Sequence, residues 1–214
     1  MATPTTAILK AIEAIVEQAQ NLHPEIPDVV IVLGASGRTR KGAKHGHFAP
    51  DSWDTSKGAP SGEVLLAGES LARGAVATLG TILHELAHAT AHVQGIRDTS
   101  NNGRYHNGKF KAIAEEFGIV VEVPELDPTI GWSKTSVPEA TVEQYASLVK
   151  ALEVALTTYR VSVLEAPAKP KKSTVVKISC ECDHPFNINR SWWDDNEGSL
   201  SCKDCFEDYK EVTE

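Results

Sequence analysis

The chain has 214 residues, of which 41% are hydrophobic, and this is enough for one sizeable core and a small appended module. Its formal net charge of −8 argues against a protein whose whole surface binds phosphate. All four cysteines lie at or beyond position 180, unlike those of a secreted fold held by disulfides. No segment has the pattern of a signal peptide or the roughly 20 apolar residues of a membrane span, so we expect a cytoplasmic protein without membrane contact.

The first half of the chain predicts helices and strands in alternation. Residues 6–22 carry apolar side chains at spacings of three and four, which predicts an amphipathic helix. The run VVIVLG at 29–34 is rich in β-branched residues and predicts a short buried strand. The stretch 35–62 is rich in Gly, Ser, Lys and Pro and predicts a hairpin or a long loop. A strand and turn at 62–71 then precede a central helix at 76–93.

The second half of the chain ends in a separate segment. Residues 107–117 predict a helix that Gly118 ends, and 119–123 predict a strand. Residues 138–159 have apolar side chains at helical spacing, with a proline suited to the first turn, and predict the last long helix. The run APAKPKKS at 166–173 has no large apolar residue, which indicates a solvated linker between two domains.

A metal-binding motif lies in the middle of the predicted central helix. In HELAH, His84 and His88 are one helical turn apart, so both imidazoles project from the same face and can share one metal ion. Glu85 projects beside them, where a metallopeptidase places the general base that activates a water molecule. No residue stands out as an oxyanion stabiliser, since Arg104 and Tyr105 are better explained by solvation and packing.

The third ligand has four candidates, His92, His106, Glu115 and Glu116. His92 extends the same helix, but ligands at i, i+4 and i+8 spread over about 12 Å along a straight helix, too far for one ion. His106 follows a predicted turn at the start of a new helix, so the chain can bring its ring back over the first helix. We therefore expect His106 to complete a catalytic zinc site, with His92 at the surface or behind the ligands.

The four cysteines predict a second, structural zinc site. CEC at 180–182 and CKDC at 202–205 have the spacing of a zinc ribbon, in which two pairs of thiolates hold one ion. His184 is an alternative ligand, because the first pair is CxC rather than CxxC. Two disulfides, or thiols that bind no metal, are the alternatives. A module this small has little core, so the metal would supply much of its folding free energy.

Contact with nucleic acid is a weaker expectation from the sequence. A tryptophan pair in the C-terminal module could stack on unpaired bases, although it could equally cover the small core. Basic stretches in the first half of the chain and in the linker could contact phosphate, although such runs are usually solvated loops. The candidates for contact with single- or double-stranded DNA are Arg38, Arg40, Lys41, Lys44, Trp192 and Trp193.

Together these motifs resemble the SprT-like zinc metallopeptidases, the family that includes the Spartan proteases acting on DNA–protein crosslinks. The resemblance rests on HELAHA at 84–89, on RYHNGKF at 104–110 and on the cysteine module that follows. In the second segment Gly108 stands one position later than in the family pattern. GWSKTS at 131–136 is similar to phage and bacterial members. The resemblance implies a zincin-like fold, His106 as third ligand, a protein substrate and an association with DNA.

The sequence thus predicts an α+β, zincin-like peptidase domain at 1–165, a linker at 166–173 and a zinc ribbon at 174–214. One catalytic and one structural zinc ion are the expected cofactors. Two other functions stay open. The first is a module that binds nucleic acid or protein, with two structural zinc ions and no turnover. The second is a protease with a narrow protein target that acts without DNA.

Overall fold

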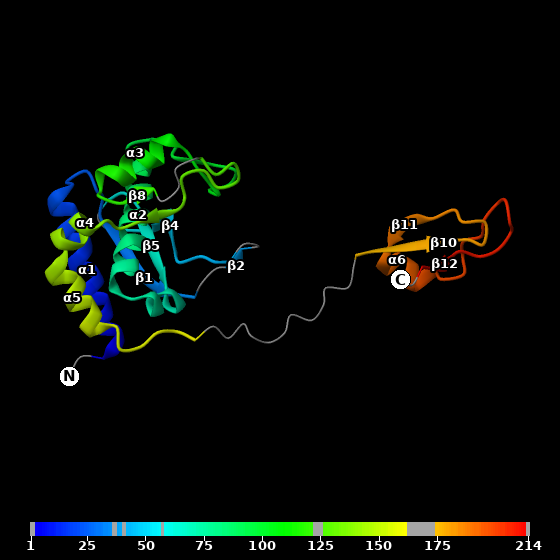
Figure 1. Cartoon of the computed structure of the whole chain (residues 1–214), viewed down its shortest axis with the longest axis horizontal. Helices are drawn as coiled ribbons and strands as arrows, with labels where there is room; N and C mark the ends of the chain where they lie inside the picture. The colour runs from blue at the N-terminus through cyan, green and yellow to red at the C-terminus, as the bar shows by residue number, and fades with distance from the viewer. Residues whose placement is uncertain are drawn as a thin grey trace. The chain divides into compact units, whose positions relative to one another are not determined.

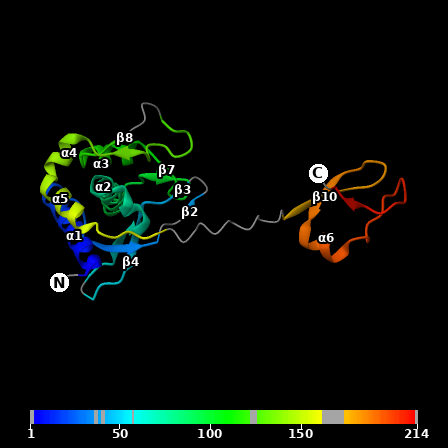
Figure 2. The same cartoon turned by 60° about the horizontal axis from the view of Figure 1, so that its bottom comes forward.

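The computed structural model describes residues 3–212 apart from 36, 37, 40, 41, 57, 122–125 and 162–173, with the backbone alone at 38, 39, 42 and 43. The chain divides into two compact units, Met1–Ser162 and Val163–Glu214. Figures 1 and 2 show helices around a small sheet in the first unit and short strands with one helix in the second. Among the described residues, no helix is both long and apolar enough to cross a membrane.

The first unit alternates helices with short strands along the chain. In order, its elements are α1 (Pro4–Leu22), β1 (Val29–Gly34), β2 (Arg38–Thr39), β3 (Gly42–Ala43), β4 (Gly46–Trp53), β5 (Ser61–Ala67), the 3-10 helix η1 (Gly68–Arg73), α2 (Ala75–Val93), β6 (Thr99–Ser100), β7 (Tyr105–His106), α3 (Gly108–Glu116), β8 (Val120–Val121), β9 (Thr135–Ser136), α4 (Glu139–Gln144) and α5 (Ala146–Ala155).

The main sheet has the strand order β1-β5-β4. β1 runs parallel to β5, from Val29 opposite Gly62 to Gly34 opposite Ala67. β4 runs antiparallel to β5 and lies at the edge of the sheet, with an irregularity between Ala49 and Trp53. The stretch predicted as a hairpin or a loop therefore contributes the edge strand β4.

The core of the first unit forms where α2 packs between the sheet, α1 and the C-terminal helices (Figure 2). α1 begins at Pro4, because the Thr3 side chain caps it by accepting a hydrogen bond from the Thr6 N–H. It buries the apolar positions that its periodicity predicts. The apolar face of α2 is buried in the core, and the face that carries the two histidines is turned toward α3. The fully buried leucine and isoleucine side chains of α2 are Leu79, Ile82, Leu83 and Leu86.

Two predicted elements differ from the observed ones. The last helix is split into α4 and α5 at Tyr145, a buried residue with φ −105° and ψ 13°. The predicted strand at 119–123 corresponds to β8, which pairs with β9, and positions 122 and 123 lie outside the described residues. The predicted linker at 166–173 also lies outside them. These differences leave the expected α+β class intact, because helices and small sheets alternate as predicted.

The second unit is a three-stranded antiparallel sheet with the order β11-β10-β12 and one short helix. Its elements are β10 (Val175–Ser179), β11 (Phe186–Asn189), α6 (Arg190–Asn196) and β12 (Lys210–Glu211). Val176, Ile178 and Trp193 form its small core. So small a core gives little hydrophobic stabilisation, and a further source such as a bound metal ion is expected.

Candidate metal centre

The two histidines of α2 lie on one face of the helix, as their spacing of four residues predicts. The ring centroids of His84 and His88 are 5.0 Å apart. The apolar residues around them hold the helix against the core, so the two rings have a fixed base. Both imidazoles point toward the start of α3, where the third histidine lies.

His106, at the end of β7, is held by backbone hydrogen bonds on both sides. Its N–H donates to the Ile130 carbonyl at 3.0 Å, and its own carbonyl accepts from the Trp132 N–H at 2.9 Å. Gly131 between them has φ +61°, and a Cβ there would lie 2.0 Å from the His106 carbonyl oxygen. Only glycine fits this contact. The segment that contains GWSKTS thus fixes the backbone of His106.

The three imidazoles converge through the same ring atom. The Nε2 atom of His106 lies 3.3 Å from Nε2 of His84 and 3.0 Å from Nε2 of His88. Nitrogens that are about 2.0–2.1 Å from a tetrahedral zinc ion lie about 3.3 Å apart, so this spacing fits one ion. Among the described residues, no fourth His, Cys, Asp or Glu joins this group. The three side chains could therefore hold a metal ion and leave one position open.

The opposite ring nitrogens of two of these histidines contact polar side chains. Nδ1 of His88 lies 2.5 Å from an Asp98 carboxylate oxygen, and Nδ1 of His84 lies 3.2 Å from the Thr135 hydroxyl. A partner on Nδ1 fixes the tautomer and turns the Nε2 lone pair toward the metal position. Nδ1 of His106 is buried and has no hydrogen-bond partner among the described residues.

Sequence reasoning missed both Asp98 and Thr135. Asp98 belongs to no motif, and it reaches His88 because α2 ends at Val93 and the chain turns back. Thr135 lies in GWSKTS, so the resemblance marked its segment without indicating its role. For Asp98, the available signal in the sequence was an acidic residue shortly after the HExxH helix.

Phe110 forms an apolar floor beneath the three ligands. Its ring centroid lies 4.7 Å from those of His84 and His88 and 4.5 Å from that of His106. The Phe110 side chain is fully buried. It is positioned because Asn107 caps α3, accepting hydrogen bonds from the Lys109 and Phe110 N–H groups. An aromatic residue four positions after His106 thus packs against all three imidazoles.

Burial favours the neutral, metal-binding form of His84 and His106. Burial first, and the neighbouring imidazoles second, hold the pKa of His84 well below its ordinary value. Burial, aided by His88, lowers the pKa of His106 to about 4. Neutral imidazoles have a free lone pair for a metal ion, so this environment suits ligation.

Glu85 is buried beside the ligands and faces the edge strand. Burial raises the pKa of Glu85 to about 7, against the opposing effects of His88, the Phe48 backbone N–H and Lys44. β4 passes close to this carboxylate, since a Cβ on Gly46 would lie 3.2 Å from Glu85 Oε1. A carboxyl with a pKa near neutrality can both accept and return a proton.

The other candidates for the third ligand lie elsewhere. Nε2 of His92 is 3.2 Å from an Asp51 carboxylate oxygen, and its ring packs near Phe48. Glu115 forms an ion pair with Lys111 at 3.7 Å. Glu116 lines a separate pocket. None of these side chains belongs to the group of His84, His88 and His106. The helix geometry had favoured His106 over His92 as the third member.

The four cysteines of the second unit also converge. Cys182 Sγ lies 3.3 Å from Cys180 Sγ and 3.6 Å from Cys202 Sγ, far beyond a disulfide bond length of about 2.05 Å. Sulfurs that are about 2.3 Å from a tetrahedral zinc ion lie about 3.8 Å apart, so the cluster of Cys180, Cys182, Cys202 and Cys205 could hold a metal ion.

His184 lies beside this cluster, and the surroundings of Cys202 favour its thiolate form. Nδ1 of His184 is 3.5 Å from Cys182 Sγ and 3.5 Å from an Asp204 carboxylate oxygen. The backbone N–H groups of Cys205 and Asp204, followed by His184, lower the pKa of Cys202 to about 5. A thiol with so low a pKa is a thiolate at neutral pH, the form that binds metal.

The structure changes the list of candidate nucleic-acid contacts. Trp193 is only 2% exposed and packs in the core of the second unit, so its assignment as a stacking surface is corrected. Trp192 is 42% exposed. Lys44 is exposed, and its charge lowers the pKa of Glu85, against the effect of burial. The side chain of Arg38 lies outside the described atoms, and Arg40 and Lys41 lie outside the described residues.

No protein-family model, no curated protein and no solved structure matches the chain. Function must therefore be inferred from the residues and geometry of the two clusters.

Proposed function

We propose that the first unit is a zincin-like, SprT-like metallopeptidase, with zinc bound by His84, His88 and His106. The observation that carries the proposal is the convergence of three imidazole nitrogens, with Glu85 next to two of them in sequence and no fourth protein ligand among the described residues. A structural zinc site normally has four protein ligands, whereas a catalytic one keeps a position open. When bound, zinc polarises the scissile carbonyl and lowers the pKa of the attacking water.

The side chains around the metal position have separable roles in this proposal. Glu85 removes a proton from the attacking water and returns it to the leaving amine, a role for which its buried position beside the histidines suits it. Asp98 and Thr135 hold His88 and His84 by their Nδ1 atoms. β4 lies at the edge of its sheet, so an extended substrate could add to it as a further strand.

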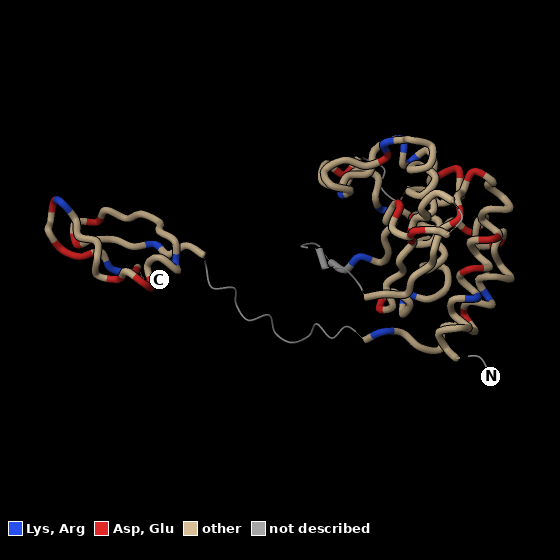
Figure 3. The backbone as a smooth tube through the Cα atoms, turned by 180° about the vertical axis from the view of Figure 1, so that it is seen from behind, with Lys and Arg blue, Asp and Glu red and all other residues tan. Residues whose placement is uncertain are grey.

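The second unit is proposed as a zinc ribbon held by its four cysteines, with His184 at its margin. Residues 174–212 carry nine Asp and Glu side chains against four Lys and Arg, and red segments outnumber blue ones there in Figure 3. An acidic surface repels phosphate, so contact with DNA through this unit would depend on stacking at Trp192. This charge favours a peptidase that acts without DNA over a DNA-dependent one.

The test is hydrolysis of casein, and of the chain itself, by the zinc-loaded protein and its Glu85→Gln variant, each with and without single-stranded DNA. We expect wild type to cleave, and the variant to keep its zinc and lose about 10²–10⁴-fold in rate. Glu153→Gln, an exposed carboxylate on α5, is the matched control and should cleave like wild type. Equal cleavage by Glu85→Gln and wild type would refute the mechanism. No cleavage by wild type with two zinc ions bound would favour a binding module.

A further inference from the structure

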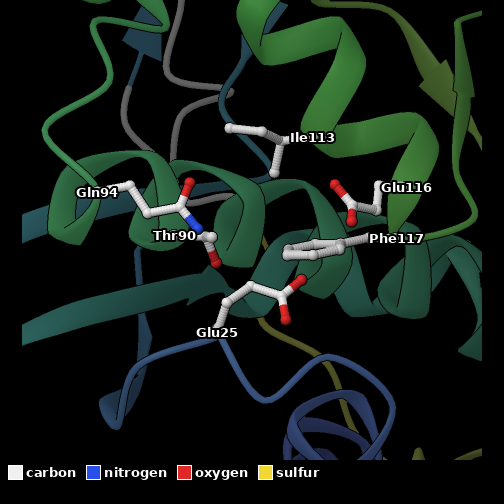
Figure 4. Close-up of a pocket in the computed structure, with 6 residues that line it drawn as sticks. All are labelled: Glu25, Thr90, Gln94, Ile113, Glu116 and Phe117. Atoms are coloured by element: carbon white, nitrogen blue, oxygen red, sulfur yellow. The ribbon is translucent and has the colours of Figure 1, made fainter.

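The pocket that Glu116 lines lies on the first unit, on a different side of α2 from the histidines. It is lined by the segment after α1, the end of α2 and the end of α3, and its volume is about 240 Å³. Thr90 follows His88 by two residues, which places it about 200° around the helix axis. The lining side chains are Glu25, Thr90, Gln94, Ile113, Glu116 and Phe117 (Figure 4).

Thr90 has a buried hydroxyl that is not used within the fold. The residue is 1% exposed, and its Oγ1 has no hydrogen-bond partner among the described residues. Buried polar atoms in folded proteins nearly always have a partner, so an unused hydroxyl that lines a pocket suggests a ligand. In Figure 4 this oxygen points toward the side of the pocket where Glu25 lies.

The pocket is acidic and has an aromatic wall. The carboxylates of Glu25 and Glu116 lie on two sides of the Phe117 ring in Figure 4, and no described Lys or Arg lines the pocket. At its margin His23 packs against Phe117, with ring centroids 4.7 Å apart, and its Nδ1 is 3.6 Å from a Glu25 oxygen. Among the described residues, neither carboxylate belongs to a group that could hold a metal ion. The chemistry therefore fits an organic cation better than an inorganic one.

We propose that this pocket binds a basic side chain of a partner protein. A guanidinium group can donate charge-assisted hydrogen bonds to a carboxylate and a hydrogen bond to the Thr90 hydroxyl. The site shares no side chain with the three-histidine centre, so its occupancy does not depend on hydrolysis.

The test uses the full zinc-loaded chain labelled with ¹⁵N and a capped Gly-Arg-Gly peptide. We expect saturable shifts of the backbone amides of Thr90, Gln94 and Phe117, and no comparable shifts with the citrulline peptide, which has the same shape without the charge. The Glu25→Gln/Glu116→Gln double variant removes both negative charges of the pocket and any charge-assisted hydrogen bond to them. It should therefore bind about tenfold more weakly or worse. The exposed Glu153→Gln variant should bind like wild type.

Thr90→Val, which keeps the volume of the side chain and removes its hydroxyl, should weaken the arginine peptide severalfold and leave the fold unchanged. Equal shifts with the citrulline peptide, or unchanged affinity in the double variant, would overturn the proposal. So would displacement of the peptide by Mg²⁺ or Ca²⁺ with shifts of the same amides, since the pocket would then bind an inorganic cation.

Discussion

Replacing Gly131 with alanine should empty the three-histidine centre and leave the cysteine centre filled. Gly131 has φ +61°, where an alanine costs about 1–2 kcal/mol. Its new Cβ would also lie 2.0 Å from the His106 carbonyl oxygen, well inside van der Waals contact. The His106 backbone cannot move away freely, because it is hydrogen-bonded to Ile130 and Trp132. Relief of the clash should cost a further 1–3 kcal/mol or so and shift the His106 ring off the metal position.

Gly95→Ala is the matched control for this substitution. Gly95 has φ +65°, so alanine meets the same backbone strain, but a Cβ there has nothing within 4 Å. The assay is zinc content per chain after dialysis, together with the free energy of unfolding from urea titration. We expect two zinc ions in Gly95→Ala and one in Gly131→Ala, which should also be the less stable variant. Equal zinc content and equal stability in both would refute the assigned role of this contact.

The remaining predictions concern the surroundings of the two centres. Asp98→Asn should weaken zinc binding by His84, His88 and His106 about 10–100-fold, because the His88 ring loses its carboxylate, and competition with a chelator measures this. Unchanged affinity would show that the contact of Asp98 is incidental. Phe110→Ala should lower the free energy of unfolding by about 3–5 kcal/mol, since it removes a fully buried ring, as urea titration would show. A loss below about 1 kcal/mol would contradict the observed packing. Cys202→Ser should unfold the second unit alone, with loss of its amide dispersion in NMR spectra and no change in the signals of the first unit. Retained dispersion would mean that metal does not stabilise this unit.

The parts of the fold that the sequence predicted are those set by periodic burial. α1 buries the apolar positions expected for residues 6–22, and α2 presents His84 and His88 on one face because their spacing is that of a helix. β4 was harder to predict, since only Phe48 and Trp53 are large and apolar among Gly, Pro and polar residues. Its position follows from pairing with β5, a long-range contact that local composition does not encode.

The sequence predicted which three histidines converge, but it did not predict which side chains support their rings. Helical geometry disfavoured His92 in advance, and a turn after α2 allowed His106 to approach. Asp98 and Thr135 come from separate loops, so only the folded chain brings them to the rings. The role of Trp193 could not be predicted, because an aromatic residue in a small unit can belong to the core or to a binding surface. Its burial in the structure decides for the core.

The most direct measurement compares zinc content and casein hydrolysis in two single variants, His106→Gln and His92→Gln. Both remove an imidazole near the HELAH helix, but only His106 has Nε2 within 3.3 Å of the other ligands. We expect His106→Gln to lose one zinc ion and its hydrolysis, whereas His92→Gln should keep two zinc ions and cleave like wild type. Retained zinc and hydrolysis in His106→Gln, or their loss in His92→Gln, would contradict the assignment of His106 as third ligand.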